Sequence, residues 1–391
     1  MTTTSRAFLS LALASALSAC SGAPHTPEAG PAPSQAPAAA PLSLEERRAS
    51  ISGEEAAAYA RRLAPMLVSR TLAADELSAL EATGGAGLPL LLAQWVEEPG
   101  FEDAARMWIS LKLKASGKRG DIDLDLPGNL AAYLVREELP YSEILKADYC
   151  VDASGAKRAC DTGAPYAAGV LATRAFLSNN AGRFNLKRAR TTMTTFACND
   201  YPMEQALQPS LARDVLIPLF QQDKVETSDG SGAFGNGFAC YSCHSQFGAH
   251  AQVFVKFDKE GRFVEDASGQ QDPTGEPGAS VSGLFTSHMI DPARARREDS
   301  QVFGRPVVNL SEAARSIAES ERFLPCAVRS LVGFGFSVAD SVTNSIDPAI
   351  VSEVVDGARA AAPDPTLRQL AIHAFSHPAI VRSMRGEGGT F

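Results

Sequence analysis

The run Cys240-Tyr241-Ser242-Cys243-His244 places two thiols and one imidazole within five consecutive residues. In Cys-x-x-Cys-His, the two thiols can form thioethers to a haem, and the histidine that follows can bind its iron. A covalently attached haem c is therefore the first prediction, with Cys240, Cys243 and His244 as its attachment residues. A Cys-x-x-Cys pair also occurs as a redox disulfide or as half of a zinc site, and these two alternatives stay open.

The first residues are typical of an exported protein. A short segment with one positive charge, Arg6, precedes the apolar run 7–17, which is too short to span a bilayer. The sequence Leu-Ser-Ala-Cys at 17–20 resembles the lipobox of bacterial lipoproteins. We therefore expect residues 1–19 to be a lipoprotein signal peptide and Cys20 to be lipidated. The alternative is an ordinary signal peptide that leaves Cys20 as an unmodified thiol.

Residues 20–45 are rich in proline and alanine, with too little apolar surface to form a core. We expect them to be a disordered tether between the lipid and the folded part. No later segment reaches the roughly 18 apolar residues that a membrane helix requires. The sequence thus predicts an exported lipoprotein that faces the periplasm and is held by its lipid alone, in the outer membrane if Ser21 acts as a sorting signal.

The chain is acidic. It contains 36 lysines and arginines and 45 aspartates and glutamates, which gives a net charge of −9. Removal of the signal peptide would remove Arg6 and bring the net charge to −10. An acidic chain without a basic run argues against nucleic-acid binding and against electrostatic docking to anionic lipid. It suits a protein partner with a positively charged rim.

Seven cysteines are present, of which one is assigned to lipid and two to haem. In an oxidising compartment the other four are expected to form two disulfides. Cys150 and Cys160 flank a polar loop, and closing it locally would stabilise the fold by about 3 kcal/mol. Cys198 and Cys326 would then tie the helical region to the region after the haem motif. Four buried free thiols are the alternative.

The periodicity predicts a mainly α protein with two domains, a helical domain at 46–225 and a cytochrome c-like haem domain at 226–391. Ser52 and Glu55 form a capping-box pattern that opens the first long helix. In the second domain, 253–257 alternates like a strand and 258–261 is turn-forming, which predicts a small β-hairpin. The expected helices cover 52–67, 75–83, 88–95, 101–111, 129–145, 169–177, 183–196, 310–319, 321–336, 349–361 and 365–375.

Several segments in this order resemble a group of exported bacterial proteins, common in planctomycetes and myxobacteria, in which helical regions precede a cytochrome c module. The resemblance implies an exported haem protein and names no substrate. The chain differs from that group after the haem histidine, where Asp-Pro is replaced by Ser-Gln-Phe-Gly at 245–248. The matching segments are NLAAYLVREELPYSEILKADYCV at 129–151, YAAGVLATRAFLSNN at 166–180, CYSCH at 240–244, VFVKFDKEGRF at 253–263 and LSEAARSIAESERFLPCAVRSLVGFG at 310–335.

The second axial ligand of the iron is less clearly marked. Met289 follows His244 by 45 residues, in a polar-flanked segment, and a Met/His pair suits an electron carrier. His288 and His250 are rivals, and either would produce a bis-histidine haem of lower potential. An open sixth position is the remaining alternative.

These features predict a membrane-anchored monohaem c-type cytochrome that transfers single electrons to or from a redox protein in the cell envelope. The first alternative is a haem-dependent oxidoreductase or peroxidase-like enzyme with an open iron position, although no motif supplies the acid or base that catalysis needs. The second is a structural lipoprotein in which Cys-x-x-Cys-His is a disulfide or metal staple.

Overall fold

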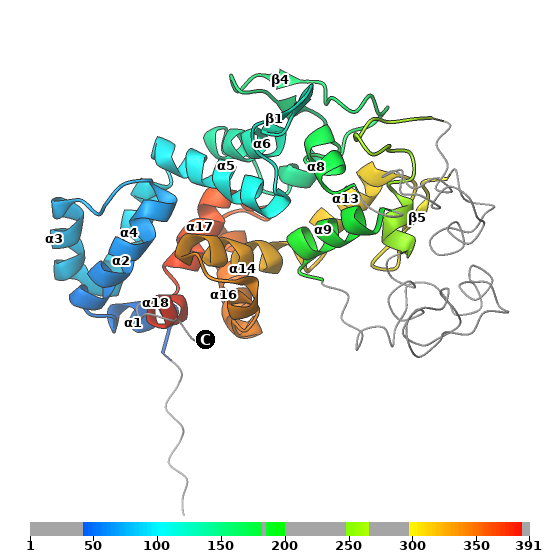
Figure 1. Cartoon of the computed structure of the whole chain (residues 1–391). Helices are drawn as coiled ribbons and strands as arrows, with labels where there is room; N and C mark the ends of the chain where they lie inside the picture. Colours follow the sequence, from blue (N-terminus) through cyan, green and yellow to red (C-terminus); the bar gives the residue numbers. More distant parts are fainter. Residues whose placement is uncertain (1–41, 182–184, 200–247, 266–296, 385–391) are drawn as a thin grey trace, which may run out of the picture. The chain divides into compact units, whose positions relative to one another are not determined.

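The structure is a computed structural model that describes residues 42–181, 185–199, 248–265 and 297–384 (Figure 1). From Leu42 onward these residues belong to one compact unit, and residues 1–41 fall outside it. The described part is mainly helical, as the periodicity predicts. None of its helices is both long and apolar enough to cross a membrane.

Five helices and one short 3-10 turn make up the N-terminal part. Ser52 caps α2 as predicted, because its hydroxyl accepts from the Glu55 N–H while the Glu55 carboxylate accepts from the Ser52 N–H. Gly84 ends α3 with φ +61, and a Cβ there would clash with the Ile51 carbonyl oxygen, so only glycine fits. The elements are α1 (Leu44–Ala49), α2 (Gly53–Leu67), α3 (Ala74–Thr83), η1 (Gly84–Gly87), α4 (Leu88–Trp95) and α5 (Pro99–Leu113).

The next region differs from the expected helices at two places. The helix expected over 129–145 is two helices, because Glu138 adopts φ +51 and Pro140 follows, and neither residue continues an α-helix. The helix expected at 169–177 begins only at Arg174, after Thr173 caps it. The elements here are α6 (Leu126–Arg136), α7 (Glu143–Lys146), α8 (Arg174–Asn179) and α9 (Leu186–Ala197).

The sheets in the described part of the chain are three short antiparallel hairpins. They pair β1 (Lys118–Arg119) with β2 (Ile122–Asp123), β3 (Cys150–Val151) with β4 (Lys157–Arg158), and β5 (Ser300–Val302) with β6 (Arg305–Val307). The strand expected at 253–257 is wrong. Residues 248–252 are helical, 253–256 form turns, and a single bridge joins Phe257 to Phe263. The turn expected at 258–261 is present, because Asp258 Oδ1 accepts from the N–H groups of residues 260 and 262.

Helix α14 lies at the centre of the C-terminal part, and twelve of its fourteen residues are buried. It packs against α2, α9, α16 and α17 (Figure 1). A helix that is apolar on nearly every side is stable only inside a core, which explains this position. The C-terminal helices are α13 (Leu310–Ala318), α14 (Phe323–Phe336), α15 (Asp340–Thr343), α16 (Pro348–Ala361), α17 (Leu367–Phe375) and α18 (Pro378–Met384).

Helices from both sides of the expected domain boundary at residue 226 share this core. The packed pairs include α14 with α2, α13 with α7 and α17 with α4. Two buried hydrogen bonds join the same regions, from Trp108 Nε1 to Ser330 Oγ at 3.0 Å and from the Tyr59 hydroxyl to the Phe375 carbonyl oxygen at 2.8 Å. The boundary itself lies outside the described residues.

Candidate functional site

Most of the predicted haem residues lie outside the part of the chain that the structure describes. This holds for Cys240, Cys243 and His244, and also for His288 and Met289. The lipidation candidate, Cys20, lies outside it as well. His250 and the four disulfide candidates are described. Near the Cys-x-x-Cys-His motif, the structure describes the residues from 248 to 265 and from 297 onward.

The segment that directly follows the motif is anchored to the residues that flank 266–296. Gln252 Nε2 donates a hydrogen bond to the Arg297 carbonyl oxygen, and Ser300 Oγ donates to the Ala249 carbonyl oxygen at 2.5 Å. At the other flank, the Lys256 ammonium donates to the Glu265 carbonyl oxygen. Both flanks of the interval that contains Met289 thus contact residues 249–256.

Chain length relates these contacts to the predicted ligands. His244 precedes Gln252 by eight residues, and Met289 precedes Arg297 by eight residues. Eight residues can span up to about 28 Å when fully extended. Since Gln252 and Arg297 are hydrogen-bonded, chain length permits His244 to lie close to Met289, and the same holds for His288, one residue earlier.

His250 is 5% exposed and lies on the helical residues 248–252. Its ring packs edge-on to Phe303, with centroids 6.2 Å apart, and borders a cavity of about 10 Å³. Burial lowers the pKa of His250 to about 4, so its imidazole is neutral at pH 7. A neutral imidazole suits iron, but a space of about one water molecule does not admit a porphyrin. To bind haem, the ring would have to leave this cluster.

The residues around the His250 cavity are mostly apolar and come from segments far apart in the sequence. Two of them, Met193 and Phe254, lie on α9 and in the turn after residue 252. Such surroundings are typical of a histidine in a core. Within the described part of the chain, the lining consists of Leu171, Ala189, Thr192, Met193, His250, Val253, Phe254, Val302, Leu310, Ala313 and Ile317.

Arg188 is a residue that the sequence reasoning missed. It is 0% exposed, and its guanidinium donates to the carbonyl oxygens of Leu177, Phe257 and Asp258 and to the Asn185 amide oxygen. Burial lowers the pKa of Arg188 to about 9, so it still carries a charge at pH 7. This side chain fastens the turn at 257–258 to α8 and α9.

A sequence signal for Arg188 exists in hindsight. Arg188, Thr192 and Phe196 recur at a spacing of four, and all three are buried on one side of α9. An arginine in line with buried positions of an amphipathic helix indicates an internal hydrogen-bonding role. Two of its acceptors come from the turn at 257–258, about 70 residues later, so they could not be read from the spacing.

A second polar contact fixes the position of Glu298, close to the point where the described chain resumes at residue 297. The Tyr166 hydroxyl donates to the Glu298 carboxylate, and the Tyr166 ring packs edge-on against Phe257 and Phe263. Burial raises the pKa of Glu298 and also that of Tyr166. The contact joins residue 298 to the same turn that Arg188 holds.

Both predicted disulfides are present. Cys150 and Cys160 are joined within the β3–β4 hairpin, and Cys198 and Cys326 join the C-terminal end of α9 to α14 across 128 residues. The second bridge therefore encloses the haem motif in the sequence. Among the described residues, no group of three or more His, Cys, Asp or Glu side chains is arranged to hold a metal ion.

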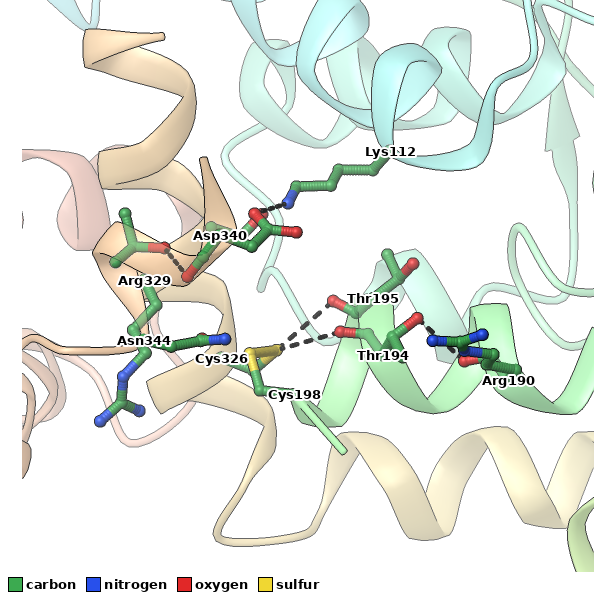
Figure 2. A pocket seen from close by; sticks show the side chains of 11 residues that line it. Lys112, Arg190, Thr194, Thr195, Cys198, Cys326, Arg329, Asp340 and Asn344 are labelled. Atoms are coloured by element: carbon green, nitrogen blue, oxygen red, sulfur yellow. Dashed lines mark hydrogen bonds and ion pairs between the residues drawn. A yellow bond between two sulfur atoms is a disulfide. The ribbon is translucent and has the colours of Figure 1, made fainter. Parts of the chain in front are cut away.

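The Cys198–Cys326 bridge also borders a polar cavity of about 290 Å³. Figure 2 shows Lys112 reaching towards it from α5, with Arg190 and Arg329 on opposite sides. Lys112 forms an ion pair with Asp340 at 2.7 Å. The described residues that line it are Lys112, Arg190, Thr194, Thr195, Cys198, Cys326, Arg329, Ser330, Asp340, Thr343 and Asn344.

Comparison with known proteins adds no relative to this description. No family model, no curated protein and no solved structure matches the chain. The resemblance noted from the sequence therefore stays an expectation, and function has to be argued from the motif and from the geometry of its flanks.

Proposed function

We propose that this protein is a membrane-anchored monohaem c-type cytochrome that transfers single electrons in the cell envelope. Cys240 and Cys243 would form the thioethers, and His244 would bind the iron on the proximal side. The observation that carries the proposal is the pentapeptide itself, which follows an export signal with a lipidation site at Cys20. The cytochrome c-like fold around the motif is part of this proposal.

The disulfides support export. Cysteine pairs that are bonded in the folded protein, as in Cys150–Cys160 and Cys198–Cys326, persist in oxidising compartments and are rare in the cytosol. Thioether attachment of haem also belongs to the exported location that the signal sequence predicts. The same environment thus accounts for six of the seven cysteines, and lipidation of Cys20 accounts for the seventh.

The flanking contacts support Met289 as the second axial ligand. They keep the two flanks of 266–296 beside the segment that follows His244, and chain length then permits Met289 and His244 to come close enough that both would hold the iron. His250 is a weaker candidate because its ring is packed in the small cavity beside Phe303. When bound, a haem with Met/His ligation supplies one-electron chemistry at a raised potential.

The described residues would act by positioning. Arg188 holds the turn at 257–258, and Gln252 and Ser300 hold the two chain segments on either side of 266–296 together. These hydrogen bonds hold the described residues on either side of 266–296 against residues 249–256. An acidic surface with a net charge of −10 after signal cleavage would favour a redox partner with a basic rim.

The test is a pyridine haemochrome spectrum of protein produced in a host that attaches haem c. We expect covalent haem in the wild type and its loss in the Cys240→Ala/Cys243→Ala variant. The matched control is Cys150→Ala/Cys160→Ala, which also removes two cysteines and should keep the haem. A colourless wild-type protein with the mass of the bare chain would refute the proposal.

The same preparation tests the distal ligand. Met289→Ala should lose the near-infrared band that arises from thioether ligation of ferric iron, whereas His250→Leu should keep it. An unchanged band in Met289→Ala would reject this assignment. Rapid binding of carbon monoxide by the wild type would instead indicate an open sixth position and favour the alternative, a haem-dependent oxidoreductase.

A further inference from the structure

Helix α1 is attached to the folded part in a different way from the helices that follow it. The structure describes all six residues of α1, and none of them is buried. Leu44, Arg47 and Arg48 are half-buried, and the other three residues are exposed. The next helix, α2, buries seven residues. Because burial of apolar surface is the main source of stability in a fold, α1 has to be held chiefly by other contacts.

The first of these contacts is an ion pair that stays open to solvent. Arg47 Nη2 lies 2.6 Å from Glu353 Oε2 on α16, and the same oxygen lies 3.1 Å from His377 Nε2. The Arg47 side chain is 32% exposed and the Glu353 side chain 45%. Ion pairs in contact with solvent contribute little and are weakened by salt. Arg47 Nε is buried without a hydrogen-bond partner among the described residues, so the docked arrangement is incompletely satisfied.

The other contacts are hydrogen bonds from two further arginines. Arg48 Nε donates to the Ser376 carbonyl oxygen at 3.0 Å, and Arg48 Nη2 donates to Ser376 Oγ at 3.1 Å. Arg382 Nη2 on α18 donates to Ser50 Oγ at 2.6 Å. The region of α1 thus lies beside the C-terminal helices (Figure 1) and is fastened to them by guanidinium groups.

The firm attachment of the chain begins one residue later. Ile51 is 2% exposed, and its carbonyl oxygen accepts a hydrogen bond from the Gly85 N–H at 3.0 Å. Ser52 then caps α2. A helix as short as α1 is unstable on its own in water, so α1 would unfold once it left the C-terminal helices. The nine residues 42–50 could then span up to about 30 Å.

We propose that α1 is a salt-sensitive strap with two states. In the docked state, Arg47 and Arg48 hold α1 against Glu353 and Ser376. In the undocked state, residues 42–50 join the tether and increase the distance that the folded part can reach from the lipid on Cys20. This role of the strap rests on the proposed lipid anchor, whereas the two states themselves do not. A rise in ionic strength shifts the population towards the undocked state, because it weakens the ion pair and leaves the buried contacts of α2 unchanged.

The test is hydrogen–deuterium exchange of the full-length protein, measured by mass spectrometry on peptides from α1 and α2. From low to high salt, exchange in α1 should accelerate by about fivefold and exchange in α2 should stay the same. At low salt, Arg47→Ala/Arg48→Ala should accelerate exchange in α1 by about tenfold. Alanine forms helices at least as well as arginine, so a lower helix propensity would not explain this loss.

A variant on the opposite side of the contact tests the ion pair without changing α1. Glu353→Gln should accelerate exchange in α1 by about threefold at low salt and should reduce its dependence on salt. The matched control is Asp356→Asn on the same helix. Asp356 is exposed, and among the described residues its carboxylate accepts only from Ser352 Oγ, so this variant should leave exchange in α1 unchanged.

Exchange in α1 that is independent of salt would overturn the inference, as would equal exchange in the wild type and in Arg47→Ala/Arg48→Ala. Acceleration of α2 together with α1 would do the same, because it would show that the whole fold opens. The haem spectrum and the mass of the N-terminal peptide are recorded on the same samples. A peptide without lipid on Cys20 would refute the anchor, and a missing haem would refute the cytochrome. Both results are therefore distinguishable from a failure of the strap.

Discussion

The two disulfides connect regions of different character. Cys150–Cys160 closes a hairpin whose strands β3 and β4 are already paired, over a separation of 10 residues. Cys198–Cys326 joins two helices over a separation of 128 residues, and side-chain packing is what otherwise holds these helices together. On the chain-entropy model the first bridge contributes about 3 kcal/mol and the second about 5 kcal/mol. The long bridge thus closes a loop of the chain that includes the Cys-x-x-Cys-His motif, whereas the short one closes the loop of a single hairpin.

The largest expected effect comes from breaking the long bridge. Cys198→Ser/Cys326→Ser should lower the free energy of unfolding by about 5 kcal/mol, and Cys150→Ser/Cys160→Ser by about 3 kcal/mol. Urea unfolding of both variants, produced and measured under identical conditions, checks the order. Equal losses, or a larger loss from the short bridge, would mean that loop length does not govern this difference.

Arg188 restrains the same enclosed segment without a covalent bond. Arg188→Met should lower the free energy of unfolding by about 4 kcal/mol, because four acceptors in the core would lose their donor. Urea unfolding measures this loss. Arg190→Met, two residues later and exposed, is the control and should change stability by less than about 0.5 kcal/mol. Similar losses in the two variants would show that the hydrogen bonds of Arg188 do not hold the turn at 257–258.

The smallest effect is expected from pH and concerns the segment just after the motif. The folded-state pKa of His250, about 4, is below its ordinary value of 6.5, so the unfolded chain binds a proton more readily. Its contribution to stability is therefore complete above pH 6.5 and is lost as the pH falls towards 4. Between pH 7 and pH 5 this amounts to about 2 kcal/mol.

Urea unfolding of the wild type and of His250→Leu at pH 7 and pH 5 checks this. His373 and His377 also have lowered pKa values and contribute a dependence of the same sign, so both proteins should lose stability at pH 5. The wild type should lose about 2 kcal/mol more than the variant. Parallel losses would contradict the burial of His250 as the cause of its lowered pKa.

The sequence predicted a helix well where the residues that start or stabilise it lie within one helical turn of each other. Ser52 and Glu55 define the start of α2, and the capping hydrogen bonds are those the pattern predicts. The central helix α14 also follows its apolar run closely, since the expected range is 321–336 and Phe323–Phe336 is observed. Such segments depend on interactions between residues three or four apart, which are visible in the sequence.

Predictions failed where distant residues decide the local conformation. The alternation at 253–257 is typical of a strand, yet 253–256 form turns, because Arg188 on α9 binds the carbonyl oxygens of Phe257 and Asp258 and holds the chain there. The expected helix over 129–145 is interrupted near Pro140, where the chain pairs with Thr366 from the C-terminal part. Neither partner could be identified from periodicity.

The sequence by itself determined the mainly helical class, most helix starts, the pentapeptide on which the cytochrome proposal rests and the two cysteine pairs. Each of these depends on residue types at short spacing or on the number of cysteines left to pair. The tertiary structure alone decided that Arg188 is buried, that both flanks of 266–296 meet residues 249–256, and that Arg190 and Arg329 line one cavity. The physical reason is that burial and charge clustering arise when helices far apart in the sequence pack together. The spacing of residues within one segment does not show which other helices that segment will contact.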